Sequence, residues 1–261
     1  MSQLDLSDVN KSFGGIKAVI RVSFRVPSGS IFGLIGPNGA GKTTVFNLVT
    51  GVYRADEGSI RLDGVDIVAK KPAQIAAAGV ARTFQNIRLF SQMSVIDNVL
   101  VACETKRRSG LEGALLRSAS FLDEEKMLRA KALELLDVFE LGRLANEPST
   151  SLSYGDQRRL EIARAMMLGP KLLLLDEPAA GMNYAEAEGL KKQIRWLRER
   201  FDLTVVLVEH HMDVVMGVSD EITVLNYGRT LAHGTPAQVQ DNPEVIEAYL
   251  GRSMENEGAE A

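Results

Sequence analysis

The sequence is poor in cysteine and has no basic excess, and each shortage excludes a class of protein. Its 261 residues include one cysteine, Cys103, and 34 acidic residues against 30 Lys and Arg, which give a net charge of −4. One cysteine excludes an internal disulfide framework and is typical of a reducing compartment, so we expect Cys103 to be a buried apolar residue. The negative charge provides no positive field for nucleic acid, and we expect no nucleic-acid partner.

The sequence also lacks long apolar runs. No stretch approaches the roughly 18 uninterrupted apolar residues of a membrane helix, and residues 1–10 lack the basic and apolar regions of a signal peptide. We therefore expect a chain that neither spans a membrane nor is exported by itself. With 45% hydrophobic residues, 1–251 is expected to form one domain with its own core, and the polar, acidic segment 252–261 is expected to be disordered.

Two kinds of strand pattern are present. The β-rich stretches Leu4–Val9, Val22–Val26 and Ser59–Leu62, with an Asp63-Gly64 hairpin signal, predict an antiparallel sheet in the N-terminal part. Short apolar runs that alternate with helical stretches predict a mostly parallel sheet buried on both faces. These runs are Ile31–Ile35, Leu172–Leu175, Thr204–Val208 and Glu221–Leu225.

A helical lobe is predicted between these groups of strands, at about 86–168. Within it, one helical face carries apolar side chains at Leu128, Ala132, Leu135, Leu136 and Phe139. The fold class is therefore α/β, with a mostly parallel core sheet, an N-terminal antiparallel β subdomain and a helical subdomain.

A glycine-rich motif after the run Ile31–Ile35 predicts a phosphate-binding loop. It reads Gly36-Pro37-Asn38-Gly39-Ala40-Gly41-Lys42-Thr43-Thr44 and precedes a helix-like segment, Lys42–Val49. Its glycines allow positive φ angles that turn backbone N–H groups inward, and the helix N-terminus adds a partial positive charge. We expect Lys42 to reach the outer phosphates of a nucleotide, Thr43 to bind Mg²⁺ and Thr44 to donate to a phosphate.

Two acids follow the run of four leucines, at the end of a predicted strand. Ligands of open α/β sheets bind at the carboxyl ends of strands. There Asp176 can hold Mg²⁺, directly or through water, while Glu177 polarises the water that attacks the γ-phosphate. His210, after the run Thr204–Val208, can contact the γ-phosphate from a neighbouring strand end, with His211 a surface residue at a helix start. Gln85, after Arg82-Thr83-Phe84, is a candidate to bind Mg²⁺ and position water, although a lone Gln is more often an ordinary loop residue.

Together these residues resemble the ATP-binding subunits of ABC transporters, and the resemblance covers Phe13 to Gly251. It implies a P-loop NTPase of the ABC type that binds ATP and Mg²⁺ and hydrolyses ATP. It also implies the following roles: Phe13 stacks on adenine, Gly36–Thr44 is the Walker A loop, Gln85 the Q-loop, Asp176 the Walker B aspartate, Glu177 the catalytic base and His210 the switch histidine.

The stretch Leu152-Ser153-Tyr154-Gly155-Asp156-Gln157 resembles the signature motif of that family. It leads into a predicted helix, Asp156–Leu168, whose N-terminus attracts phosphate. In the family two subunits pack head to tail, so Ser153 and Gly155 of one would cover the γ-phosphate held by Lys42 of the other. The resemblance therefore implies a second ABC ATPase subunit, identical to this chain or different from it.

Three residues depart from the family pattern. Tyr154 stands in place of the first glycine of the common Leu-Ser-Gly-Gly-Gln, and Asp156 in place of its glutamine. Asn183 ends the loop after Glu177, where the family usually has Asp. We expect the site to work with Ser153 and Gly155 retained, provided that the Asp156 carboxylate does not face the phosphate.

Five further stretches of the sequence resemble the larger ATPase of branched-chain amino acid importers. The similar stretches are Asn86–Phe90, Thr105–Leu122, Tyr154–Arg164, Glu177–Asn183 and Pro243–Gly251. This resemblance implies two membrane permeases, a solute-binding protein that acts indirectly, and a peripheral location at the cytoplasmic face of the inner or plasma membrane. The apolar residues Ile87, Leu89, Phe90 and Met93 would then form the surface that receives the permease, or else fill the helical lobe.

Other functions are compatible with the same residues. Importers of urea, amides or other amino acids have similar ATPases, as does lipopolysaccharide export, whose ATPases normally lack the Thr105–Leu122 stretch. A non-hydrolysing regulator gated by ATP would have lost its base, whereas Glu177 is present. A P-loop kinase does not explain Ser153 and Gly155 ahead of a helix. Soluble relatives in DNA repair or translation usually carry coiled coils or two nucleotide domains, and neither is found here.

Overall fold

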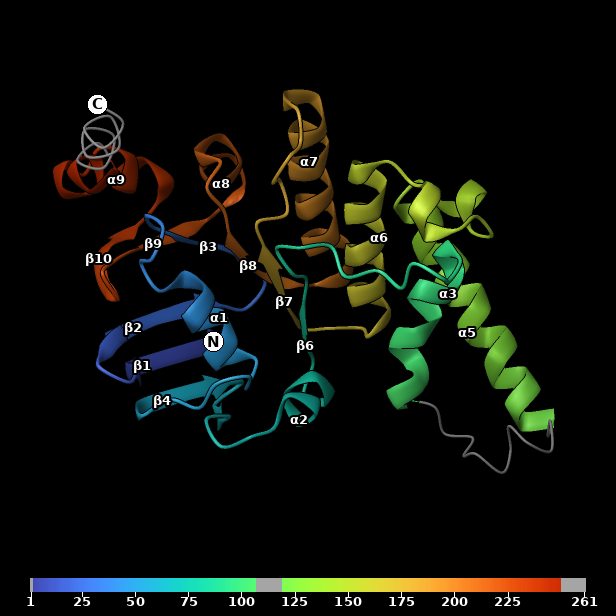
Figure 1. Cartoon of the computed structure of the whole chain (residues 1–261), viewed down its shortest axis with the longest axis horizontal. Helices are drawn as coiled ribbons and strands as arrows, with labels where there is room; N and C mark the ends of the chain where they lie inside the picture. The colour runs from blue at the N-terminus through green and yellow to red at the C-terminus, as the bar shows by residue number, and fades with distance from the viewer. Residues whose placement is uncertain (1, 107–118, 250–261) are drawn as a thin grey trace. The chain divides into compact units, whose positions relative to one another are not determined.

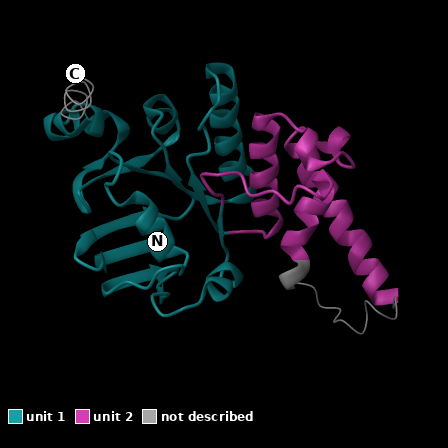
Figure 2. Cartoon of the chain, in the orientation of Figure 1, with its two compact units in different colours: residues 1–82, 171–261 teal, residues 83–170 magenta. Residues whose placement is uncertain are grey.

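The computed structural model describes residues 2–106 and 119–249, which fold into two compact units (Figures 1 and 2). Unit 1 consists of Met1–Arg82 and Lys171–Ala261, and unit 2 of Thr83–Pro170. The predicted tail 252–261 and the middle of the stretch Thr105–Leu122 lie outside the described residues. No helix in the described ranges is both long enough and apolar enough to cross a bilayer.

An antiparallel sheet occupies the N-terminal part of unit 1, as predicted. Its strand order is β2-β1-β4-β5, where β1 is Ser2–Phe13, β2 Ile16–Pro27, β4 Glu57–Leu62 and β5 Val65–Asp66. The turn between β4 and β5 falls at Asp63 and Gly64, which both have positive φ (49° and 77°), as a two-residue hairpin loop requires.

A six-stranded sheet forms the centre of unit 1. Its order is β10 (Arg229–Gly234), β9 (Glu221–Asn226), β3 (Ile31–Ile35), β8 (Thr204–Val208), β7 (Leu172–Asp176) and β6 (Val80–Arg82). All neighbours are parallel except β10, which is antiparallel to β9. The four predicted apolar runs are its four inner strands. The two edge strands were missed, because β6 has only three residues and β10 is half-buried or exposed along its length.

Helices of unit 1 lie around the six-stranded sheet (Figure 1). They are α1 (Lys42–Val49), α2 (Pro72–Ala77), α7 (Tyr184–Phe201), α8 (Met212–Val218) and α9 (Pro236–Gln240). Helix α8 approaches β3 closely, because Gly33 has no side chain: a Cβ there would lie 2.9 Å from Val215. This close packing fixes the strand that leads into the glycine-rich loop.

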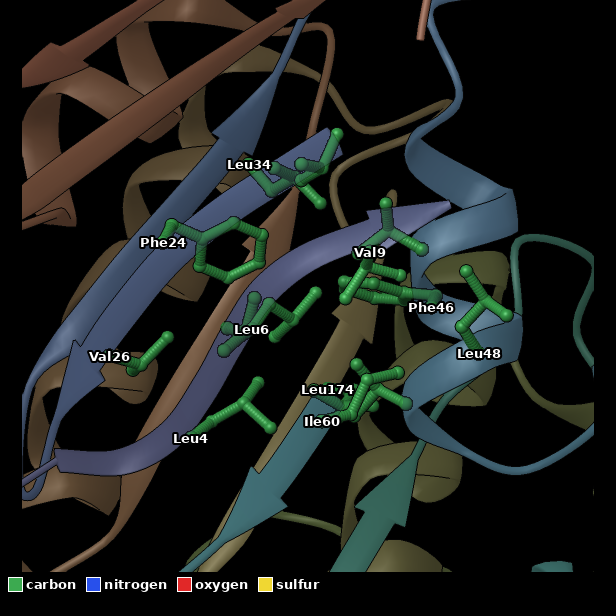
Figure 3. Packing of buried hydrophobic residues seen from close by; sticks show 14 of the residues in the cluster. Leu4, Leu6, Val9, Phe24, Val26, Leu34, Phe46, Leu48, Ile60 and Leu174 are labelled. Atoms are coloured by element: carbon green, nitrogen blue, oxygen red, sulfur yellow. The ribbon is translucent and has the colours of Figure 1, made fainter. Parts of the chain in front are cut away.

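A hydrophobic core of unit 1 lies between the two sheets and α1 (Figure 3). Side chains alternate along each central strand, so every second residue faces this core. The strands of the larger sheet contribute Phe32, Leu34, Leu172, Leu174, Val206 and Val208, and α1 contributes Phe46 and Leu48. Full burial of each such side chain stabilises the fold by about 1.5–3 kcal/mol. Helix α1, which follows the glycine-rich loop, and strand β7 therefore share one core.

Unit 2 is helical, as predicted for the lobe. It contains α3 (Val95–Leu100), α5 (Ala119–Val138) and α6 (Tyr154–Met167), with short 3-10 helices at Val101–Lys106, Gly142–Leu144 and Ser149–Ser151. The predicted apolar face of α5 buries Ala132, Leu135 and Leu136. Cys103 is buried, as expected. Helix α6 begins at Tyr154 rather than at Asp156, because the Ser153 side chain accepts the Asp156 N–H and thereby caps the helix there.

Candidate functional site

The glycine-rich loop connects β3 to α1 in unit 1 and needs its glycines. Gly36, Gly39 and Gly41 have φ angles of 148°, 79° and 103°. A Cβ on Gly36 would lie 2.1 Å from the Leu225 carbonyl oxygen, and one on Gly41 would lie 2.6 Å from the Ala18 carbonyl oxygen. Glycine alone therefore fits these two positions, and the backbone turns tightly enough to present N–H groups to an anion.

Lys42 is held inside this loop. Its side chain is buried, and its Nζ donates to the carbonyl oxygens of Gly36 at 2.6 Å and Pro37 at 3.0 Å. Thr43 is exposed and Thr44 half-buried at the first turn of α1. The predicted phosphate ligands thus lie together at the N-terminus of one helix.

Asp176 ends β7 as a buried carboxylate with a cationic partner. Its Oδ2 accepts a hydrogen bond of 2.7 Å from Arg82 Nη2, and both side chains are less than a tenth exposed. Arg82 also donates to Asn47 Oδ1 of α1 at 2.6 Å. Arg82 thereby connects the strand of Asp176 to the helix of the phosphate loop. Sequence reasoning missed this residue, because a single Arg in a three-residue strand carries no recognisable pattern.

Thr43 and Asp176 offer the oxygen donors that Mg²⁺ prefers. In the ranges 2–106 and 119–249, no group of three or more His, Cys, Asp or Glu side chains could hold a metal ion. Two side chains of this kind suit an ion that takes its remaining oxygens from nucleotide phosphates and water, as Mg²⁺ commonly does.

Glu177 and His210 are brought together by two neighbouring strands. Glu177 follows β7, His210 follows β8, and His210 Nε2 lies 2.6 Å from Glu177 Oε1. The Glu177 N–H donates to the Val208 carbonyl oxygen at 2.8 Å, and Glu177 has a φ of 48°, which is unusual for a residue other than glycine. His211 is the exposed residue before α8, as expected.

The signature stretch belongs to unit 2, and its serine has a partner within its own helix. Ser153 Oγ donates to Asp156 Oδ2 at 2.8 Å and accepts the Asp156 N–H at 3.2 Å. Asp156 also lies 3.5 Å from Arg159, which offsets part of its charge. The Asp156 carboxylate is thus directed at Ser153 and Arg159.

Gln85 also lies in unit 2, where its side chain is exposed. Its carbonyl oxygen accepts a hydrogen bond from Arg158, a buried side chain of α6 that also bonds Phe84 O at 2.6 Å and Glu161 at 3.2 Å. Glu161 in turn accepts the Phe84 N–H at 3.2 Å. Burial raises the pKa of Glu161 above its ordinary value, against the opposing effects of the Phe84 N–H and Arg158. This pair attaches the Gln85 loop to the helix of the signature stretch.

Phe13 ends β1 and is partly exposed beside a second aromatic ring. Its ring centroid lies 4.9 Å from that of Tyr53 in an edge-to-face arrangement, and Lys11 Nζ lies 5.4 Å from the Phe13 centroid. An exposed aromatic face of this kind can stack on a planar base.

Tyr249 is a further residue at the loop that sequence reasoning missed. It lies in the helical residues 243–249, and its side chain has a hydrogen bond with the backbone of Gly36. Burial raises the pKa of Tyr249 to about 12. No local pattern could have placed this tyrosine at a loop more than two hundred residues earlier in the chain.

Two protein-family models match the chain. "ABC transporter" matches residues 19–180, and "Branched-chain amino acid ATP-binding cassette transporter" matches residues 229–254. The high-affinity branched-chain amino acid transport ATP-binding protein BraF of Pseudomonas aeruginosa is 46% identical over 96% of this chain and 98% of BraF. The protein LivG of Escherichia coli K12, which has the same description, is 46% identical over 97% of this chain and 100% of LivG.

Solved structures share the fold. The ADP conformation of MJ1267, an ATP-binding cassette of an ABC transporter, has a TM-score of 0.84 at 31% identity and covers 96% of this chain and 99% of that one. A dimeric post-hydrolysis state of the cassette MJ0796, bound to ADP and Pi, has a TM-score of 0.75 at 26% identity, over 89% of this chain and 98% of that one.

Proposed function

Because this chain belongs to the ABC transporter ATPase family, we propose that it is the ATP-hydrolysing subunit of a branched-chain amino acid importer. The Glu177–His210 contact of 2.6 Å carries the hydrolase part of the proposal, because it provides an oriented carboxylate at the strand ends. The similarity to BraF and LivG along nearly the whole chain supports branched-chain amino acids as the transported substrate.

The residues of unit 1 divide the work of phosphoryl transfer. The backbone N–H groups of the glycine-rich loop and Lys42 bind the phosphates of ATP. Thr43 and Asp176 would hold Mg²⁺, which neutralises charge on the phosphate oxygens when it is bound. Glu177 accepts a proton from the attacking water, and His210 orients the Glu177 carboxylate when its Nε2 carries a proton. Phe13 stacks on the adenine.

We infer a composite site in which Ser153 and Gly155 of a second ABC subunit, identical or different, complete the γ-phosphate pocket. The capped N-terminus of α6 offers the partial positive charge that phosphate needs. The dimeric state of MJ0796 bound to ADP and Pi supports this arrangement. Closure of the pair around ATP, and its reopening after hydrolysis, would supply the motion that a transporter uses.

The composite site predicts an effect of Asp156. Because the Asp156 carboxylate accepts the hydrogen bond of the Ser153 hydroxyl and places a negative charge at the N-terminus of α6, Asp156→Gln is expected to lower the KM for ATP. An exposed charge pair contributes up to about 1 kcal/mol, so the decrease is about fivefold or less. Steady-state hydrolysis by the assembled transporter measures it, with Asp123→Asn in α5 as a control. A KM that rises would indicate that Asp156 supports nucleotide binding.

The proposal places two membrane permeases against unit 2 at the cytoplasmic face of the membrane, and a solute-binding protein acts through them. Of the four apolar residues expected there, Phe90 is 47% exposed, and Ile87, Leu89 and Met93 are half-buried. The Asn98 side chain holds the Phe90 backbone by two hydrogen bonds. Its Oδ1 accepts the Phe90 N–H at 2.8 Å, and its Nδ2 donates to the Phe90 carbonyl oxygen at 3.1 Å. An apolar side chain on a fixed backbone suits a helix that docks there.

Uptake in cells tests the cargo. Cells that lack this chain are expected to lose high-affinity uptake of labelled leucine, isoleucine and valine, and the wild-type chain is expected to restore it. Uptake of labelled urea and acetamide is measured in the same cells as a comparison. Restored urea or amide uptake with unchanged leucine uptake would keep the ATPase and overturn the proposed cargo.

A further inference from the structure

Glu209 is a fully buried carboxylate that the mechanism above does not use. It follows β8 directly and is 1% exposed. Carboxylates are almost never buried to this degree unless other groups compensate their charge. In the described part of the chain no Lys or Arg forms an ion pair with Glu209, and peptide N–H groups bond its oxygens instead.

Three backbone donors from two loops share this carboxylate. Oε1 accepts the Ala179 N–H at 2.5 Å, and Oε2 accepts the N–H groups of His210 at 3.0 Å and His211 at 3.3 Å. Ala179 belongs to the loop after β7, and the two histidines belong to the loop after β8. One side chain therefore connects two segments that are about thirty residues apart in sequence.

These two loops carry the pair that performs the proposed proton transfer. Glu177 lies two residues before Ala179, and His210 is itself one of the donors to Glu209. The Glu177 Oε1–His210 Nε2 distance of 2.6 Å thus depends on how the two loops are held relative to each other. Since Glu177 has a positive φ, its backbone needs such support to keep that conformation.

We propose that Glu209 is a positioning residue for ATP hydrolysis: by bonding both loops it keeps the Glu177 carboxylate opposite His210. The inference rests on the proposed function and adds a residue that is not among the proposed nucleotide and metal ligands. Burial raises the pKa of Glu209, and the three N–H donors oppose that rise. N–H groups are suitable partners for a carboxylate, because a carboxylate has about four acceptor positions and no donor.

Two conservative changes separate the charge of Glu209 from its length. In Glu209→Gln one oxygen is replaced by an NH₂ group, which cannot accept, so one of the two loops loses its bond. In Glu209→Asp the charge remains, but the side chain is one C–C bond, about 1.5 Å, shorter and cannot reach both loops. Both variants leave Lys42 and the glycine-rich loop intact.

Steady-state ATP hydrolysis by the assembled transporter tests the proposal. A displacement of about 1 Å at a reacting group can lower a rate about 100-fold, so we expect kcat to fall about 10- to 100-fold in Glu209→Gln while the KM for ATP stays within about twofold. Glu199→Gln, the same change at an exposed site of α7, is the control and is expected to match wild type. A folded Glu209→Gln with wild-type kcat would overturn the proposal. If Glu209→Gln does not fold, Glu209→Asp is judged by the same criterion.

A double-variant comparison distinguishes positioning from general stabilisation. If Glu209 acts through Glu177, Glu209→Gln adds less than about a twofold loss in a chain that already carries Glu177→Gln. Losses that multiply would show that Glu209 acts independently of Glu177 and would contradict the proposal. Turnover retained in Glu177→Gln alone would instead contradict the proposed function, so the two failures are distinguishable.

Discussion

We expect Glu177→Gln to lower the kcat of ATP hydrolysis about 100- to 10,000-fold while ATP still binds, because the amide cannot accept the proton of the attacking water. The change keeps the size of the side chain, and the His210 contact can persist through the amide oxygen. Single-turnover hydrolysis and nucleotide titration of the same preparation separate the two effects. The variant is expected to favour the closed pair of subunits, since ATP is bound and not consumed.

Glu199→Gln is the matched control for this experiment. It makes the same chemical change on the surface of α7, where Glu199 is 68% exposed and pairs only weakly with Arg198 at 3.5 Å. We expect its turnover to equal that of wild type. Wild-type turnover in Glu177→Gln would remove Glu177 from the role of base.

We expect Lys42→Ala to weaken ATP binding itself about 10- to 100-fold. A hydrogen bond to a charged group contributes about 1.5–3 kcal/mol, and each 1.4 kcal/mol corresponds to a factor of ten in Kd. Because Lys42 is buried against the Gly36 and Pro37 carbonyl oxygens, Lys42→Met is a second variant that keeps most of the apolar stem. Titration with ATP measures the Kd of each variant.

The control for Lys42 is an exposed lysine of unit 1. Lys192→Ala, on the surface of α7, removes the same charge away from the glycine-rich loop and is expected to leave the Kd unchanged. Normal ATP affinity in both Lys42 variants would contradict the assignment of the loop as the phosphate site.

The parts of the fold that were predicted from the sequence are those with local signals. The glycine-rich loop contains a fixed spacing of glycines and a lysine, and α1 begins and ends at the predicted residues, Lys42 and Val49. The runs of apolar residues became the inner strands of the six-stranded sheet because strands buried on both faces need apolar residues at every position. The strand order then brought Glu177 and His210 to adjacent strand ends.

The parts that were missed depend on contacts between distant segments. Arg82 pairs with Asp176 across 94 residues of sequence, and Glu209 bonds Ala179 across 30. Neither partner forms a spaced motif with the other, so a single sequence has no pattern that relates them. The edge strand β6 was missed for a similar reason: its three residues become a strand only by pairing with β7.

The orientation of Asp156 was a conditional expectation, and the structure supplies its physical reason. A carboxylate at the third position of a helix accepts a hydrogen bond from the hydroxyl of the capping serine and interacts favourably with the helix N-terminus. The sequence alone could not choose between this local arrangement and one in which the carboxylate faces a phosphate, since both leave Asp156 at the same end of α6.

The most direct test of the account measures ATP hydrolysis and leucine uptake together in vesicles that contain the complete transporter. With wild-type chain we expect leucine to accumulate only when ATP is present on the side of the nucleotide-binding subunits. With Glu177→Gln we expect both hydrolysis and accumulation to stop, although ATP still binds. Leucine accumulation that continues in the Glu177→Gln vesicles would contradict the claim that hydrolysis by this chain drives branched-chain amino acid import.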